Sequence, residues 1–338
     1  MRFQAYDDEG RARHFAALAM RPEDERLHAV PESAGFDWAE TNMFGFNIPE
    51  HQIDCMVWFI YRPKLGATYG GVILWQGCKT HYLESEVFDF RAGLPLPADN
   101  THWECPNGIR IEMTEPLVAF NISYRQPDGD IRFDLELRAS MPPAMRYNGN
   151  HITQAMRTHG ILSMNGTQYT IDGYYSRDRS WNEHRDEAPK SVPPLSWIAG
   201  VFGDDFAFHL TAFESPLRRP EWAGRYAAPA VGENVLWGYV WDHGRLLGID
   251  RADLYVHRPD HLTPVKATLC LDAHDGGRYH IDGRVIALNP AMGWPNIVTR
   301  YALTEWRCRG EMGWGDIQDV MFQDHLRYAL QQAAHTRI

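Results

Sequence analysis

The sequence predicts a mainly β protein built from two sequential antiparallel barrels or sandwiches, and three observations lead to this prediction. Short segments in which apolar and polar residues alternate recur along the 338 residues, and such alternation is typical of half-exposed antiparallel strands. Tight-turn sequences such as Pro127-Asp128-Gly129 and Asn165-Gly166 separate these segments. Strands do not alternate with long helical patterns, which argues against a doubly wound or (β/α)8 fold.

In the first half of the chain, strands are expected after Pro49, because the lead-in before it is irregular and interrupted by proline. The clearest strand covers residues 131–137, where apolar and charged side chains alternate with a strict period of two. A short helix is expected at residues 10–20. The other strands expected in this half are residues 55–61, 71–75, 109–113 and 117–124.

The second half repeats this pattern of paired strands around tight turns. Residues 317–334 have apolar side chains at roughly helical spacing and predict a C-terminal helix; the alternative is a final strand that closes the sheet. The most polar stretch, residues 176–194, is the expected joint, so the predicted domains are residues 1–185 and 190–338. The strands expected in this half are residues 160–164, 168–171, 197–202, 206–213, 235–241, 245–249, 265–271, 279–288 and 298–307.

Composition and charge exclude several classes of function. The chain has 33 basic and 44 acidic residues, a net charge of −11, and no basic run, which argues against nucleic-acid binding. No apolar run approaches the roughly 18–20 residues of a membrane span, and the first residues lack the apolar core of a signal peptide. We therefore expect a cytoplasmic monomer or homodimer without a transmembrane segment.

The motifs of metal, nucleotide and serine-hydrolase sites are missing from the sequence. The five cysteines are widely spaced and form no CxxC pair, which argues against a disulfide framework and a structural zinc site. Neither a nucleotide-binding glycine motif nor a G-x-S-x-G elbow occurs. We expect no metal and no cofactor.

Aromatic residues are abundant, with 12 Trp, 15 Tyr and 15 Phe. Trp237, Tyr239 and Trp241 occur at every second position of a predicted strand, so they line one of its faces. Together with Trp75, they are candidates for binding an apolar or ring-shaped substrate. The alternative is that this face packs against the other domain.

Residues 172–186 combine arginine, acidic residues and tryptophan. Arg177, Arg179 and Arg185 are interleaved with carboxylates around Trp181, which predicts a buried ion network capped by a ring that also lines the substrate site. The alternative is a network that only locks two domains together.

Asp178 is a candidate catalytic residue in this segment. A carboxylic acid that serves as a general acid must stay neutral near pH 7, and desolvation beside Trp181 could provide this. The neighbouring Arg177 and Arg179 would favour the carboxylate instead and make Asp178 a structural ion-pair partner.

His209 is the second catalytic candidate. It lies within residues 206–213 on the face opposite Phe208, and we expect it to point into a barrel lumen, where it could transfer or orient a proton. The alternative is a core or surface histidine without a catalytic role.

Residues 160–186, with Trp197 and the GDDFAFHLTAFE stretch that follows it, resemble the AttH/hydroxyneurosporene synthase-like superfamily, which includes the carotenoid 1,2-hydratases. The family's R-D-x-S-W signature is matched by Arg177-Asp178-Arg179-Ser180-Trp181. Asn182 stands where the family usually has glycine, and the next arginine, Arg185, comes later than in the family. The lead-in Trp38-Ala39-Glu40-Thr41 resembles that of an uncharacterised bacterial branch.

This resemblance implies two lipocalin-like (calycin) barrels with few helices and a ligand cavity near their junction. It also implies a cofactor-independent lyase or isomerase, since relatives include carotenoid hydratases, tocopherol cyclases and Diels–Alder-type cyclases. We expect a hydratase, dehydratase or cyclase that acts by acid-initiated chemistry on an apolar unsaturated small molecule such as an isoprenoid or steroid. The alternatives are a non-catalytic lipocalin-like carrier of a hydrophobic metabolite and a carbohydrate-active β-sandwich.

Overall fold

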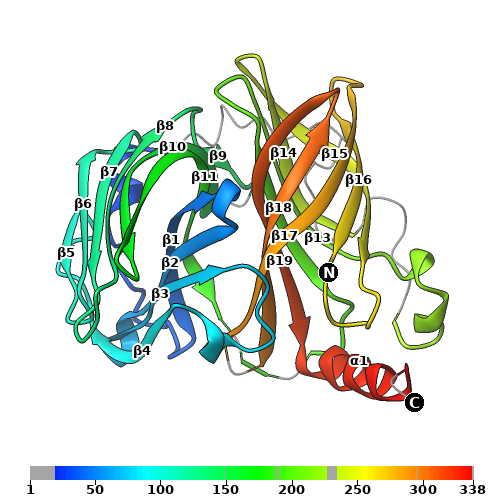
Figure 1. Cartoon of the computed structure of the whole chain (residues 1–338), viewed down its shortest axis with the longest axis horizontal. Helices are drawn as coiled ribbons and strands as arrows, with labels where there is room; N and C mark the ends of the chain where they lie inside the picture. The colour runs from blue at the N-terminus through cyan, green and yellow to red at the C-terminus, as the bar shows by residue number, and fades with distance from the viewer. Residues whose placement is uncertain are drawn as a thin grey trace. The chain divides into compact units, whose positions relative to one another are not determined.

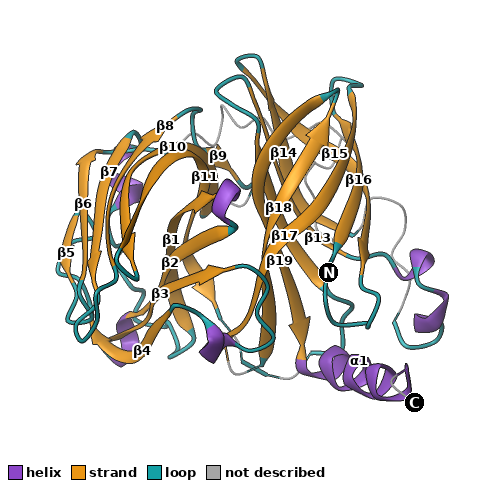
Figure 2. Cartoon of the chain, in the orientation of Figure 1, coloured by secondary structure: helices purple, strands orange, loops and turns teal. Residues whose placement is uncertain are grey.

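The computed structural model describes residues 20–147, 149–185, 187–188, 190–226, 234–294 and 296–336. Within these ranges the chain is mainly β, as predicted, and forms two compact units (Figures 1 and 2). The N-terminal unit contains residues 20–76 and 83–185, and the C-terminal unit contains residues 77–82 and the described residues from 187 onward. Among the described residues, no helix combines the length and the apolar character needed to cross a bilayer.

The N-terminal unit is an eleven-stranded antiparallel sheet that curls around its core (Figure 1). The strand order is β4-β3-β2-β1-β11-β10-β8-β7-β6-β5, and β9 pairs with β10. Its strands are β1 (Trp38–Ile48), β2 (Ile53–Arg62), β3 (Ala67–Gln76), β4 (Val87–Pro95), β5 (His102–Glu104), β6 (Ile109–Glu115), β7 (Ala119–Arg125), β8 (Arg132–Ala139), β9 (Ala144–Met145), β10 (His151–Met164) and β11 (Thr167–His184).

One side of this sheet carries the apolar core, and we call it the core side. Buried side chains such as Phe44, Phe59, Phe133 and Leu162 cluster there. In β8, exposed and buried residues alternate as the sequence predicts. Because successive strand residues point to opposite faces, their neighbours along each strand lie on the outer side.

The C-terminal unit is a closed barrel of eight antiparallel strands, in which β12 pairs with β19 to complete the ring. Its interior is filled by apolar side chains, among them Phe208, Leu210, Leu254 and Ile317. The strands are β12 (Leu195–Val201), β13 (Phe206–Phe213), β14 (Val235–Asp242), β15 (Arg245–His257), β16 (Lys266–Ala273), β17 (Arg278–Trp294), β18 (Ile297–Cys308) and β19 (Glu311–Phe322). Helix α1 (Gln323–Thr336) follows the last strand.

Short 3-10 helices connect several strands, and most begin with a proline, whose fixed φ suits a first helical position. They are η2 (Pro22–Glu25), η3 (Pro49–His51), η4 (Pro63–Leu65), η5 (Tyr82–Glu84), η6 (Pro216–Arg218) and η7 (Pro220–Trp222).

Three local predictions need correction. Strand β1 begins at Trp38, before the expected onset of strands at Pro49. It is buried on both faces, so its sequence lacks the alternation of apolar and polar residues that marks a half-exposed strand. The predicted helix at residues 317–334 begins only at Gln323, and the residues before it form the closing strand β19. Much of the polar stretch expected as a joint, from residue 176 to His184, belongs to β11. The helix predicted at residues 10–20 lies, except for its last residue, outside the described residues.

Candidate functional site

Strand β11 carries the arginine- and aspartate-rich motif, and its alternation sorts the motif onto two faces. Arg177 and Arg179 share the core side with Ile171, and the guanidinium of Arg177 lies 4.7 Å from the ring centroid of Phe120. Asp178 points to the outer side, where its Cα pairs across the sheet with that of Thr153. The motif therefore builds two separate polar groups.

On the core side, Arg177 is bound by a buried glutamate from the lead-in segment. Its Nη2 lies 2.6 Å from Oε1 of Glu25 and its Nη1 lies 3.1 Å from Oε2. The Nε atom donates to Oε1 of Gln154 at 2.7 Å. Arg177 and Glu25 are at most 1% exposed, so this is a fully desolvated ion pair with two-pronged geometry.

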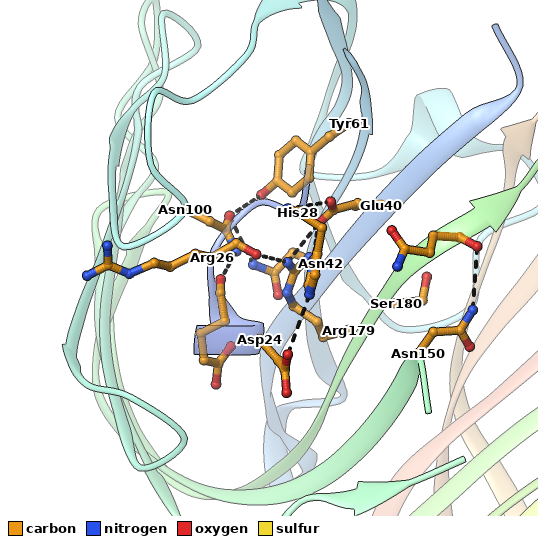
Figure 3. A network of polar contacts seen from close by, with 12 residues as sticks. Asp24, Arg26, His28, Glu40, Asn42, Tyr61, Asn100, Asn150, Arg179 and Ser180 are labelled. Carbon is orange, nitrogen blue, oxygen red and sulfur yellow. Dashed lines mark hydrogen bonds and ion pairs between the residues drawn. The ribbon is translucent and has the colours of Figure 1, made fainter. Parts of the chain in front are cut away.

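A second buried ion pair joins the motif at residues 177–181 to the lead-in at residues 38–41. Nη2 of Arg179 donates to Oε2 of Glu40 at 2.7 Å, and Glu40 also accepts the backbone N–H of His28 at 2.8 Å (Figure 3). Burial alone would raise the pKa of Glu40, but the hydrogen bonds from His28 and the charge of Arg179 hold it below its usual value. The imidazole of His28 stacks on Trp181 with ring centroids 5.0 Å apart, so Trp181 does cap the network.

A phenol and an amide also bind the backbone of the lead-in segment (Figure 3). The Tyr61 hydroxyl donates to Oδ1 of Asn100 at 2.8 Å, and Nδ2 of Asn100 donates to the backbone oxygen of Glu25 at 2.9 Å. Burial raises the pKa of Tyr61 well above its ordinary value, so this phenol stays protonated. The network thus fastens residues 24–28 to the inside of the sheet.

On the outer side, Asp178 forms a short contact with a histidine. Its Oδ2 atom lies 2.7 Å from Nε2 of His151 and accepts a hydrogen bond from Oγ1 of Thr153 at 3.2 Å. The side chains of His151 and Asp178 are 12% and 11% exposed. A carboxylate that fixes an imidazole is a recurring arrangement in acid–base catalysis.

The expected ion pairs between Asp178 and its neighbouring arginines are therefore wrong. Arg177 and Arg179 lie on the opposite face, paired with Glu25 and Glu40. Arg185, unlike Arg177 and Arg179, does not bind Glu25 or Glu40. Its Nη2 donates to Oγ of Ser180 at 3.1 Å.

In the C-terminal unit, His209 lies on the outer face of the barrel rather than in the lumen. The neighbouring residues Phe208 and Leu210 belong to the barrel interior, and alternation directs His209 the other way. Its ring centroid lies 4.6 Å from that of Trp237 and 5.8 Å from that of Tyr239, and its Nε2 lies 3.0 Å from Oγ1 of Thr211.

The remaining predicted aromatic residues occupy separate places. Trp241 shares the face of Trp237 and Tyr239 through its pairing with Ala207, but its indole N–H donates to the backbone oxygen of Asp204 in a hairpin loop at 2.8 Å. Trp75 belongs to the N-terminal unit and is buried on the outer side of its sheet.

Sequence reasoning assigned no role to His151, His28, Glu25 or Glu40. His151 could have been found from the hairpin around Asn165, as argued in the Discussion. The glutamates leave no such signal, because they come from distant parts of the chain. Among the described residues, no group of three or more His, Cys, Asp and Glu side chains has an arrangement that could hold a metal ion.

The two barrel-like units define an architecture shared with several solved structures. Kievitone hydratase from Nectria haematococca aligns with a TM-score of 0.52 at 12% identity, covering 84% of this chain and 88% of that one. CghA aligns with a TM-score of 0.53 at 12% identity, covering 88% and 93%. A putative AttH from Nitrosomonas europaea aligns with a TM-score of 0.50 at 12% identity, covering 87% and 96%.

These similarities show that the chain shares the fold of these three proteins. The family described as "Domain of unknown function (DUF7064)" matches residues 21–322, and the chain belongs to this family. No curated protein matches the chain.

Proposed function

We propose that this protein is a cofactor-independent lyase that adds water to, or removes it from, an apolar unsaturated small molecule, with His151 and Asp178 as its acid–base pair. The observation that carries the proposal is the 2.7 Å contact between His151 Nε2 and Asp178 Oδ2 in a largely buried setting. The fold adds support, because one protein that shares it is named a hydratase.

The geometry suits proton transfer through the imidazole of His151. A neutral imidazole has one donor and one acceptor nitrogen, so an Nε2–H donated to Asp178 makes Nδ1 the basic nitrogen. Nδ1 is buried, so the side chains that cover it must move before a substrate can reach it. The Asp178 carboxylate fixes the ring orientation and compensates the positive charge that develops when Nδ1 takes a proton. Thr153 holds the same carboxylate oxygen and keeps it in place.

The proposed reaction balances with water as the only co-reactant. In dehydration, His151 takes a proton from the carbon next to the hydroxyl-bearing carbon, and that C–H electron pair forms the double bond. The C–O bond breaks, and the oxygen leaves as water after the His151 imidazolium returns this proton to it. Hydration is the reverse, with the imidazolium delivering the proton to carbon.

The packing of the C-terminal barrel argues against the carrier alternative for that unit. A lipocalin-like carrier holds its ligand in the lumen. Here Phe208, Leu210 and Ile317 are fully buried in one interior cluster, so protein side chains occupy the barrel axis.

A screen for turnover tests the proposal. Purified protein is incubated with a panel of isoprenoid and steroid alkenes and the corresponding alcohols, and products are analysed for gain or loss of one water by mass spectrometry. For any compound that the wild type converts, we expect His151→Gln to lower turnover by about 10²- to 10⁴-fold, since general acid–base groups contribute on this scale.

His159→Gln is the matched control, because His159 is an exposed histidine on the same strand. It should leave turnover unchanged. Undiminished turnover by a folded His151→Gln protein would contradict the proposed pair. If every compound that binds is recovered unchanged, the carrier alternative replaces the lyase.

A further inference from the structure

Arg300 lies at the end of the C-terminal barrel near α1 and is bound by no side chain of the part of the chain that the structure describes. Its Cα pairs with that of Asp319 across β18 and β19, so both side chains point to the interior face. It makes no hydrogen bond or ion pair with the described residues, and its Nη1 atom is buried without a hydrogen-bond partner. The residue as a whole is half-buried.

The nearest carboxylates are already committed to another arginine. Arg258 binds both oxygens of Asp319 at 2.6 and 2.7 Å, and its Nη1 lies 2.6 Å from Oε2 of Glu214. The other Glu214 oxygen accepts Nε of Arg219 at 2.6 Å. These four side chains form a charge-balanced network at the barrel end. Arg219 also lies 3.8 Å from the more exposed Glu221, and Arg300 lies beside the network without joining it.

The nearby carboxylates Asp319 and Asp260 favour the charge of Arg300, but neither forms an ion pair with it. The Asp260 carboxylate accepts the backbone N–H groups of Leu262 and Thr263 and the Thr263 hydroxyl. Burial and the charge of Arg258 lower the pKa of His325 to about 3, so this imidazole is neutral at physiological pH. Burial, reinforced by Arg258, likewise lowers the pKa of Arg300.

We propose that Arg300 is the centre of a binding site for a small oxyanion, a carboxylate or a phosphate group. A partly buried guanidinium without a direct ion-pair partner is costly, and its planar fork matches two oxygens of such an anion. This site belongs to the C-terminal unit, whereas His151 and Asp178 belong to the N-terminal unit, so it is independent of the proposed lyase function.

Thermal unfolding in different anions tests the site. The melting temperature of the wild-type protein is measured in increasing sodium phosphate, sodium acetate and sodium chloride at matched ionic strength. We expect a saturable rise in phosphate, acetate or both, reaching about 5 °C when the anion exceeds its Kd about a hundredfold. The two oxyanion series distinguish a phosphate from a carboxylate ligand.

Arg300→Met should abolish this rise and should not lower the melting temperature in the absence of oxyanion, because it removes a partly buried charge that has no direct ion-pair partner. Arg300→Lys keeps the charge but lacks the fork, so it should need at least tenfold more anion for the same rise. Arg327→Met, at an exposed position of α1, is the control and should respond like the wild type.

Two results would overturn the site. One is an equal response of the wild type to chloride and to both oxyanions, or no response at all. The other is an Arg300→Met protein that keeps the full oxyanion response, because the anion would then bind elsewhere.

Discussion

Each of the two arginines on the core side of β11 is held by a buried glutamate. Arg179 and Glu40 are at most 1% exposed and lie 2.7 Å apart. Such a pair contributes little net stability compared with apolar side chains of the same size, but removal of one partner leaves an uncompensated charge in the interior. Removal of either partner should therefore be costly.

We expect Glu40→Gln to lower the free energy of unfolding by about 3–5 kcal/mol, because Arg179 then keeps its charge without a counter-charge. Urea denaturation of the purified variant measures this. Asp172→Asn is the control: Asp172 pairs with Arg157 on the same hairpin at 3.6 Å, but both side chains are more than half exposed. That change should cost less than about 1 kcal/mol. Equal losses in the two variants would show that burial does not set the cost.

For these residues, the sequence predicted that the arginines belong to a buried ion network, but it did not predict which carboxylates bind them. Arg177, Arg179 and Trp181 do form one buried group, as their clustering suggests. The adjacent carboxylate of the same segment could not pair with these arginines, because a strand places adjacent residues on opposite faces. The partners Glu25 and Glu40 are 152 and 139 residues away along the chain, and only the folded sheet brings them close.

The β10–β11 hairpin is the element that assembles the proposed acid–base pair. Its turn residues Asn165 and Gly166 have φ values of 53° and 73°, as a type I′ turn requires. Counted outward from this turn in equal steps, Thr153 falls opposite Asp178, and His151 is its diagonal neighbour. The sequence motif Asn-Gly therefore contained enough information to place His151 beside Asp178.

Gly166→Val should destabilise the protein by about 1 kcal/mol or more, because a β-branched residue strongly disfavours positive φ. The space around Gly166 is open, so the backbone conformation, not a clash, is the cause. Gly166→Asn should cost less, since asparagine tolerates this region. Thermal midpoints of the three proteins measure the effect, and coinciding midpoints for wild type and Gly166→Val would refute the explanation.

Other elements were harder to predict for identifiable physical reasons. Strand β1 contains Glu40, Asn42 and Asn47 at buried positions, so it lacks the apolar run that marks a central strand. Residues 317–322 carry apolar side chains that fit a helix as well as a strand. Only closure of the ring by the pairing of β19 with β12 decides between them.

At the scale of the whole molecule, the predicted β architecture is confirmed, and the candidate residues divide between its two units. Asp178, Trp75 and Trp181 belong to the N-terminal unit, whereas His209 and Tyr239 belong to the C-terminal unit. The sequence placed His209 on the correct side of its strand relative to Phe208 but assigned that side to the lumen. Alternation defines two faces without saying which one is enclosed, and only barrel closure settles this.

The central claim is that Asp178 serves catalysis rather than stability, and Asp178→Asn tests it most directly. Turnover and melting temperature are measured on the same preparation, with a substrate that the wild type converts. We predict that turnover falls by about 10²- to 10⁴-fold while the melting temperature barely moves, because the amide keeps the shape but cannot compensate an imidazolium. Undiminished turnover, or a loss of activity that only follows a lower melting temperature, would contradict the account.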